Sequence, residues 1–336
     1  MAGETSPAVL GLGGMGGTHA AAAKASPYVR RFPGSAPGPA RAALADIAVI
    51  DTHVHLWDTD RFRYPWLAHA PGLNRPFLPA DYRRATAGLN IEAMVFLQGE
   101  AEPSRSHDEV AWVTAQTVCE PRIRGIVARA AVERGEAVRD DLIRLRRNPL
   151  VRGVRRIVQD EMDPAFCLRP GFVRGVQLLA EFDLHFEICL KGDAQFRAAI
   201  ALVRQCPGVR FVLDHIGKPF IREGLLSPWA GNMCELAALP NAWCKLSGLV
   251  NEAAWKRWTV AGLRPYIDGA VAAFGFDRLF YGGDWPVCTQ ASAYRSWVEA
   301  LHEAVGGCTA LERRKLFHDN AEAFYRLAPP WRSLHP

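Results

Sequence analysis

The chain has 336 residues, of which 49% are hydrophobic and 22% are charged, and its formal net charge is +5. This composition is typical of a globular protein, and the lack of a basic stripe interleaved with aromatic residues argues against a nucleic-acid partner. The eight cysteines form no CxxC pair, which disfavours a zinc finger or a disulfide scaffold and favours a reducing, cytoplasmic compartment. No run of about 18 apolar residues occurs, so the sequence predicts neither a membrane span nor a membrane partner.

Residues 1–45 differ from the rest of the chain. They are rich in Gly, Ala and Pro and lack hydrophobic periodicity. We therefore predict a flexible leader over residues 1–45 and a folded domain over residues 46–336.

From residue 46 onward, short apolar runs alternate with longer amphipathic segments. The runs are typical of strands that are buried on both faces of a parallel sheet. Helical periodicity appears between them, for example over 107–120, 171–182 and 193–206, and again in a terminal helix over 311–327. The predicted strands lie within residues 43–56, 91–100, 123–132, 151–159, 184–192, 209–217, 242–249 and 278–286.

The sequence shows eight strand–helix steps, and a doubly wound open sheet would alternate in the same way. Eight steps in one domain of this length favour a closed (β/α)₈ barrel, or TIM barrel. In such a barrel the carboxyl ends of the strands form a single cup, and that cup holds the active site.

The first predicted strand carries the unusual stretch IDTHVHLWD at residues 50–58. Because side chains alternate along a strand, His53 and His55 are expected on one face together with Asp51. Two imidazoles side by side are either polar groups at a wetted strand end or part of a metal or proton-transfer site.

The other strands decide between these two interpretations. Polar residues occur near the ends of six strands, which would bring them together in one cup. We therefore predict a catalytic site formed from His53, His55, Gln98, Glu100, Arg155, Glu187, His215 and Asp284.

Several motifs together resemble the amidohydrolase superfamily. Within it, the chain is similar to the TIM-barrel lactonase group that includes L-fuconolactonase, L-rhamnonolactonase, 4-sulfomuconolactone hydrolase and 2-pyrone-4,6-dicarboxylate lactonase. The resemblance covers about residues 47–328 and rests on IDTHVHLWD, YPWL at 64–67, VRGVRRIVQDE at 151–161, FVLDHIGKP at 211–219, CKLSGLVNEA at 244–253, YGGDWPVC at 281–288 and DNAEAFYRL at 319–327. The YPWL and IVQDE features are closest to the sugar-acid branch.

The resemblance implies roles for particular residues. His53, His55, His215 and Asp284 match positions that ligate metal or move protons. The fourth predicted strand lacks the lysine that bridges two metals in many members, so a bridged binuclear site is not expected. Glu187 matches an acidic position after the fifth strand, and His185 shares its face.

We expect Asp284 to take a proton from water and to return it to the leaving oxygen of a lactone. The resemblance admits one divalent metal, with Zn²⁺ as the first choice and His53, His55, Glu187 and Asp284 as its ligands. It also leaves metal-free catalysis open, since some lactonases of the group work without metal. In the metal-free case, His215 and the paired histidines would donate hydrogen bonds to the oxyanion. The expected substrate contacts are Trp57, Tyr64, Trp66, Gln98, Glu100, Arg155 and Trp285, although Trp57 and Trp66 are equally well explained by packing of their loop.

The expected function is hydrolysis of the lactone of a sugar acid. One alternative is hydrolysis of a carboxylated lactone from aromatic degradation, with Arg155 and Arg156 binding the carboxylates. Another is a barrel that binds a sugar acid without catalysis. Since Arg155 and Arg156 alternate in face, only one of them is expected to enter the cup.

Overall fold

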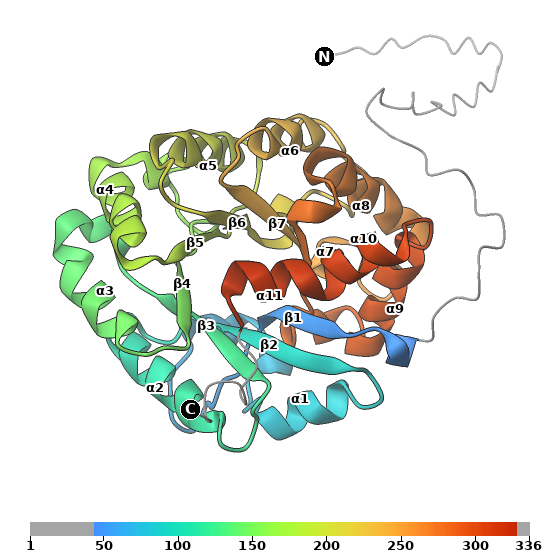
Figure 1. The fold of residues 1–336 in the computed structure, drawn as a ribbon, viewed down its shortest axis with the longest axis horizontal. Coiled ribbons are helices and arrows are strands. Elements are labelled where there is room, and N and C mark those ends of the chain that lie inside the picture. The colour runs from blue at the N-terminus through green and yellow to red at the C-terminus, as the bar shows by residue number, and fades with distance from the viewer. Residues whose placement is uncertain (1–43, 328–336) are drawn as a thin grey trace, which may run out of the picture.

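The computed structural model describes residues 44–327, which form a ring of eight parallel strands surrounded by helices (Figure 1). Neighbouring strands pair in chain order, which confirms the predicted (β/α)₈ barrel. Residues 1–43 of the predicted leader lie outside the described residues, so its flexibility stays a prediction. The strands are β1 Val49–Val54, β2 Ile91–Leu97, β3 Ile123–Arg129, β4 Val151–Arg155, β5 His185–Ile188, β6 Phe211–Leu213, β7 Ala242–Leu246 and β8 Leu279–Tyr281.

The ring closes between β8 and β1. Val54 and Trp285 form a parallel β-bridge, and the His55 N–H donates to the Trp285 carbonyl at 2.7 Å. The Thr52 hydroxyl donates to the Tyr281 carbonyl at 2.6 Å. These contacts bring the His-x-His stretch next to the segment that follows β8.

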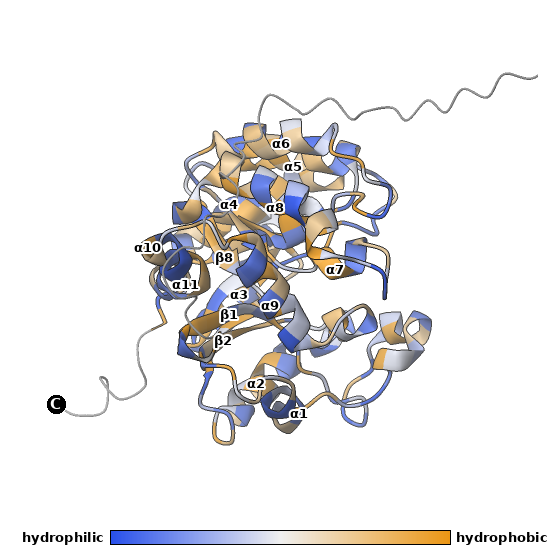
Figure 2. Ribbon diagram, turned by 90° about the vertical axis from the view of Figure 1, so that its right-hand side faces the viewer, coloured by the Kyte–Doolittle hydropathy of each residue, from blue (hydrophilic) through white to orange (hydrophobic). Residues whose placement is uncertain are grey.

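The helices form the outer layer and bury their apolar sides against the strands, as the hydropathy colouring shows (Figure 2). In α5, Phe196, Ile200 and Val203 are buried, whereas Arg197 and Arg204 are exposed, as expected for a period of 3.6 residues. None of the helices within residues 44–327 is both long and apolar enough to cross a membrane. The helices are α1 Pro79–Ala85, α2 Ser106–Gln116, α3 Arg139–Arg146, α4 Pro170–Leu178, α5 Asp193–Gln205, α6 Trp229–Ala237, α7 Leu249–Glu252, α8 Val260–Phe274, α9 Tyr294–Ala304, α10 Ala310–Arg314 and α11 Asn320–Tyr325.

A second apolar core fills the inside of the barrel and is closed by α11. Phe324 and Tyr325 of this helix pack against inward-facing residues such as Val95 and Phe280. Arg210, which precedes β6, donates to the Phe324 carbonyl at 2.9 Å, so α11 lies at the amino ends of the strands. The terminal helix predicted over 311–327 is divided into α10 and α11 by a π-helical turn. In the side view, α11 and α7 lie toward opposite sides of the barrel (Figure 2).

Candidate active site

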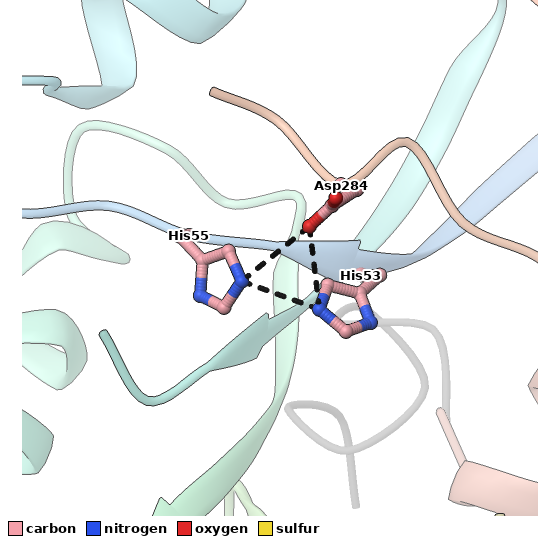
Figure 3. A group of neighbouring side chains, drawn as sticks. All are labelled: His53, His55 and Asp284. Atoms are coloured by element: carbon pink, nitrogen blue, oxygen red, sulfur yellow. Dashed lines mark hydrogen bonds and ion pairs between the residues drawn. The ribbon is translucent and has the colours of Figure 1, made fainter. Parts of the chain in front are cut away.

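His53, His55 and Asp284 come together at the carboxyl ends of β1 and β8 (Figure 3). The two histidine Nε2 atoms are 3.2 Å apart. Oδ1 of Asp284 lies 3.6 Å from Nε2 of His53 and 3.7 Å from Nε2 of His55. All three side chains are buried, so the cluster is largely shielded from bulk water.

Asp51 does not share the face of these histidines, contrary to the prediction from strict alternation. The register between β1 and β2 shifts after Asp51, which breaks the two-residue period before His53 and His55 are reached. The Asp51 carboxylate instead accepts hydrogen bonds from the hydroxyls of Tyr82 in α1 and Tyr294 in α9, at 3.0 and 2.8 Å. Asp51 therefore faces the helix layer.

From this position Asp51 holds the segment that carries Asp284. Its Oδ1 atom accepts the Gly283 N–H at 2.7 Å. A Cβ atom at position 283 would lie 2.5 Å from Oδ2 of Asp51 and 2.4 Å from the Tyr294 ring, so only glycine fits there. Asp284 itself has a positive φ of 52°, a conformation that the surrounding contacts must maintain.

The hydrogen bonds around the two histidines define which ring nitrogens carry lone pairs. Nδ1 of His55 lies 2.9 Å from the Leu97 carbonyl, so it carries the proton and leaves Nε2 as a lone pair. Nη1 of Arg155 lies 3.3 Å from Nε2 of His53, and because a guanidinium only donates, this Nε2 also bears a lone pair. Two lone pairs thus face each other beside the Asp284 carboxylate. A cation bound between them would remove the repulsion between these electron-rich atoms.

The geometry of the cluster fits a metal ion. Ligand atoms of a tetrahedral zinc site with bonds of about 2.0–2.1 Å lie about 3.3–3.4 Å apart. The separations of 3.2, 3.6 and 3.7 Å among His53, His55 and Asp284 are close to this value. Two neutral imidazoles and a carboxylate form a donor set that Zn²⁺ commonly accepts.

Burial shapes the ionisation of the cluster. It lowers the pKa of His55 to about 3 and holds the pKa of His53 well below its usual range, so both rings are neutral near pH 7. Burial also raises the pKa of Asp284 to about 7, although Lys218 and Arg155 act in the opposite direction. A carboxyl group with a pKa near neutrality is suited to take up and release a proton.

His215 follows β6 and faces the same space. Its Nδ1 atom lies 2.9 Å from the Ser247 hydroxyl, which follows β7 and orients the ring. The ring centroids of His215 and His53 are 4.4 Å apart. The structure therefore places His215 beside the two histidines of β1, as the sequence predicts.

Asp214 and Arg155 form a buried layer directly behind His53. Oδ1 of Asp214 lies 3.4 Å from Nδ1 of His53, and Oδ2 accepts from Nη1 of Arg155 at 3.1 Å. Arg155 also donates to the Gln98 carbonyl at 2.9 Å. This carboxylate orients the imidazole from the side opposite Asp284, as outer partners of metal-binding histidines commonly do.

Glu187, predicted as a metal ligand, lies one layer deeper in the barrel than the cluster. It is in register with Val212 of β6, two residues before Asp214, so its side chain points into the barrel below the site. Its carboxylate binds Lys245 at 2.5 Å, the Tyr325 hydroxyl at 2.8 Å and Nε2 of His185 at 3.1 Å. The geometry therefore does not support Glu187 as a ligand, and Asp214 is the carboxylate next to His53.

The cluster opens into a cavity of about 530 Å³. Four of the predicted substrate contacts line it, namely Trp66, Gln98, Glu100 and Arg155, together with His55, His215 and Asp284. Gln98 and Glu100 are linked, since the Gln98 amide donates to Oε1 of Glu100 at 2.6 Å. The cavity therefore combines hydrogen-bonding groups with an aromatic ring, which is typical of a site for a polar small molecule.

Trp57, Tyr64 and Trp285 do not line this cavity, contrary to the prediction. Each is at most 4% exposed and belongs to the hydrophobic core. The Trp57 indole N–H donates to the Arg75 carbonyl at 2.8 Å, so the loop after β1 folds this ring back onto the barrel. Of the two tryptophans predicted in this loop, only Trp66 reaches the cavity.

Sequence reasoning missed the site roles of Asp214, Lys218 and Lys245. Asp214 and Lys218 flank His215 within the motif FVLDHIGKP, and Lys245 lies within the motif CKLSGLVNEA. A lysine inside a buried strand is a usable signal, because a charge at such a position requires a partner.

Glu109 of α2 supports the cavity wall from behind. Its Oε1 atom accepts the N–H of Gly99, the residue between Gln98 and Glu100, at 3.1 Å. Burial raises the pKa of Glu109 from 4.5 to about 8. The folded state therefore binds the proton more tightly than the unfolded state, and raising the pH from about 4.5 to 8 should lower stability.

We expect Glu109→Gln to weaken this pH dependence, because the amide keeps the acceptor oxygen but cannot ionise. As the pH rises over this range, the unfolding free energy of the wild type should fall relative to that of the variant, by at most about 1.4 kcal/mol per pH unit. Urea unfolding at several pH values measures the difference. Parallel pH profiles for the two proteins would contradict the expectation.

The chain was compared with known proteins. The Amidohydrolase family profile matches residues 50–327. An L-fucono-1,5-lactonase from Burkholderia multivorans is 32% identical over 293 residues, covering 84% of this chain and 97% of the relative. An L-fucono-1,5-lactonase from Burkholderia ambifaria is 31% identical over 304 residues, covering 85% and 98% of the two chains. The crystal structure of an amidohydrolase from Burkholderia multivorans with bound zinc superposes with a TM-score of 0.75 at 32% identity, covering 84% of this chain and all of that one. The chain belongs to the amidohydrolase family.

Proposed function

We propose that the protein is a hydrolase that opens the lactone ring of a sugar acid. The observation that carries this proposal is the convergence of His53, His55 and Asp284 beside a polar cavity that His55 and Asp284 line. The relatives named L-fucono-1,5-lactonase, at 31–32% identity over nearly their whole length, support the substrate class.

Ring opening requires a nucleophilic water and a proton for the departing oxygen. Asp284 lies on the cavity wall, and its pKa of about 7 allows it to accept the proton of the water and return it to the ring oxygen. His215 faces the same space and is held by Ser247, so it can position the water or the carbonyl group. Because His55 presents a lone pair to the cluster, it acts as a ligand or acceptor rather than as a donor to an oxyanion.

We further propose that His53, His55 and Asp284 hold one divalent metal, with Zn²⁺ as the best match. When bound, Zn²⁺ polarises a carbonyl group and lowers the pKa of its water toward about 7. The facing lone pairs of the two imidazoles and the ligand spacings support this assignment.

The sugar moiety would be recognised by the other residues of the cavity. Gln98, Glu100 and Arg155 offer donors and acceptors for hydroxyl groups, and the half-buried Trp66 offers a ring face for the apolar side of a sugar. The indole N–H of Trp66 donates to the Gly99 carbonyl at 2.8 Å, which fixes the ring against the segment that carries Gln98 and Glu100.

The alternative of a carboxylated substrate bound by two arginines is weakened by their contacts. Arg155 is buried and already paired with Asp214 at 3.1 Å. Arg156 pairs with Glu133 at 3.0 Å and with Glu161 at 2.5 Å. Arg155 lines the cavity and Arg156 does not, which supports a site that only one arginine of this pair enters. The intact cluster of potential ligands also argues against a barrel that only binds its ligand.

A panel of aldonolactones of different ring size and stereochemistry, followed with a pH indicator, tests the function, because hydrolysis releases acid. NMR of the product distinguishes the free acid from a rearranged lactone. The carboxylated lactones form a second arm of the panel. The proposal fails if no sugar lactone is opened faster than in buffer.

Metal removal should lower both activity and stability. We expect about one zinc per chain in freshly purified protein, and we expect a chelator to lower the melting temperature and added Zn²⁺ to restore it. A ligand at a hundredfold excess over its Kd stabilises the folded state by about 2.7 kcal/mol. Differential scanning calorimetry with and without Zn²⁺ measures this independently of catalysis. Full activity in protein shown to be free of metal would contradict the metal assignment.

The proposed location is cytoplasmic, on the evidence of the eight cysteines without paired spacing. The proposed partner is a small-molecule lactone.

A further inference from the structure

The turn after β6 has an unusual backbone. His215, Ile216, Gly217 and Lys218 have φ values of 53°, 48°, 73° and 48°, so four consecutive residues, three of them not glycine, adopt the left-handed region. Non-glycine residues avoid this region, and where they adopt it the cause is often functional. The turn brings both His215 and Lys218 to the cavity wall.

Lys218 is half-buried and its ammonium group is held by a neutral partner. Its Nζ atom donates to Oε1 of Gln159, which also accepts from the Cys189 thiol at 3.4 Å. Within residues 44–327, no carboxylate oxygen lies within 4.0 Å of this ammonium group. An ammonium group has three N–H donors, so two remain for a ligand.

Two other cations of the cavity wall are already paired with carboxylates. Arg155 is paired with Asp214 at 3.1 Å, and Lys191 is paired with Glu252 at 3.3 Å. Lys218 therefore differs from both in having its charge available to a bound molecule.

Lys218 lines the same cavity as the reacting groups Asp284 and His215. Among charged neighbours it has the largest effect on the pKa of both Asp284 and His215, lowering each, after the larger effect of burial. Its own pKa stays above the ordinary value, because Cys189, Glu252 and Asp284 outweigh its burial. The ammonium group is thus protonated near neutral pH and faces the space that Asp284 and His215 share.

We propose that Lys218 is a further catalytic residue, whose ammonium group donates a hydrogen bond to the carbonyl oxygen of the lactone as that oxygen becomes negatively charged. This inference rests on the proposed ring opening. The lactone is neutral, and a full negative charge develops only on the oxyanion of the tetrahedral intermediate and on the carboxylate of the ionised product acid. A fixed cation with free donors stabilises those states more than the substrate.

The proton balance leaves Lys218 unchanged. Water adds its oxygen to the carbonyl carbon and gives one proton to Asp284. The bond between the carbonyl carbon and the ring oxygen then breaks, and the ring oxygen takes the proton from Asp284. The second proton of the water stays on the new carboxyl group and passes to solvent when the product acid ionises. Lys218 keeps its three protons throughout and carries only the hydrogen bond to the oxygen that bears the charge.

The test compares Lys218→Met with Lys315→Met, a control that removes one lysine charge at a distant surface ion pair with Asp277. Each protein is assayed on the best lactone of the panel. Inhibition is measured with the product acid and with a neutral cyclic ether of the same sugar, which lacks the carbonyl group. Lys218→Arg, which keeps the charge, serves as the conservative variant.

We expect kcat/KM to fall by about 10²-fold or more in Lys218→Met, as on removal of an oxyanion donor, and to recover partly in Lys218→Arg. The inhibition constant of the product acid should rise by about tenfold or more, whereas that of the neutral ether should change little. The Lys315→Met protein should match the wild type.

If the wild-type protein does open lactones, two results would overturn the role of Lys218 and leave the proposed function standing. One is a Lys218→Met enzyme within about threefold of wild-type kcat/KM, well below the usual effect of an oxyanion donor. The other is equal weakening of the acid and the neutral ether, which would indicate a structural role for the link to Gln159. A wild-type protein that opens no lactone would overturn the proposed function, and this inference with it.

Discussion

Replacing Asp284 with asparagine is expected to lower kcat by about 10²-fold or more, the usual size of a general acid–base contribution. Asparagine keeps the shape of the side chain but cannot accept the proton of the attacking water. Substrate binding should survive, so the loss should appear mainly in kcat. The carboxylate faces His53 and His55 at 3.6 and 3.7 Å, so the same change should also weaken zinc binding.

The alternative explanation is that Asp284 only caps its own loop. In that case stability would fall by about 1 kcal/mol and kcat would hardly change. Among residues 44–327, no backbone N–H donates to the Asp284 side chain, which disfavours the cap. Asp277→Asn, at an exposed residue, is the matched control. A folded Asp284→Asn protein with nearly wild-type kcat would remove this residue from the mechanism and leave His215 as the candidate base.

Replacing Lys245 with methionine is expected to destabilise the protein by about 3–5 kcal/mol, the usual cost of breaking a buried ion pair. Lys245 is fully buried between Glu187 at 2.5 Å and Asp214 at 3.3 Å. Its removal leaves two buried carboxylates without this cation. Because Asp214 orients His53, the variant should also bind zinc more weakly than the wild type.

Urea unfolding of Lys245→Met measures the loss of stability. The double variant Glu187→Gln and Lys245→Met removes one charge of each sign, so it should recover part of the stability. Lys315→Met, which breaks the surface pair with Asp277, should change stability by less than about 1 kcal/mol. A loss of less than about 1 kcal/mol in Lys245→Met would show that the buried network contributes little.

The barrel could be predicted from the sequence because eight predominantly apolar runs alternate with amphipathic helical segments. The positions of Asp284 and His215 could also be predicted, since they lie within three residues of the carboxyl ends of β8 and β6, where the loops surround the cup. The pair His53 and His55 was correctly placed on one face. Asp51 was not, because a local register shift leaves no clear sign in the sequence.

Depth within the barrel was the main quantity that the sequence could not provide. Alternation gives the face of the strand on which Glu187 lies, but not its height relative to the next strand. That height depends on the stagger between β5 and β6, which pairs Glu187 with Val212 rather than with Asp214. The positions of the Trp57 and Trp66 rings could not be predicted either, because the loop after β1 can turn one ring into the core and the other toward the cavity.

The closure of the barrel by α11 has a consequence for protein synthesis. Tyr325, whose hydroxyl binds Glu187 at 2.8 Å, leaves the ribosome after all eight strands have been made. Until then Glu187 lacks one of its hydrogen-bond donors, and the apolar interior around Phe280 is open to water. A nascent chain that stops before residue 320 therefore contains every ligand and proton-transfer group but not the helix that completes their support. We therefore expect the active site to be fully supported, and the enzyme to become active, only after α11 has been translated.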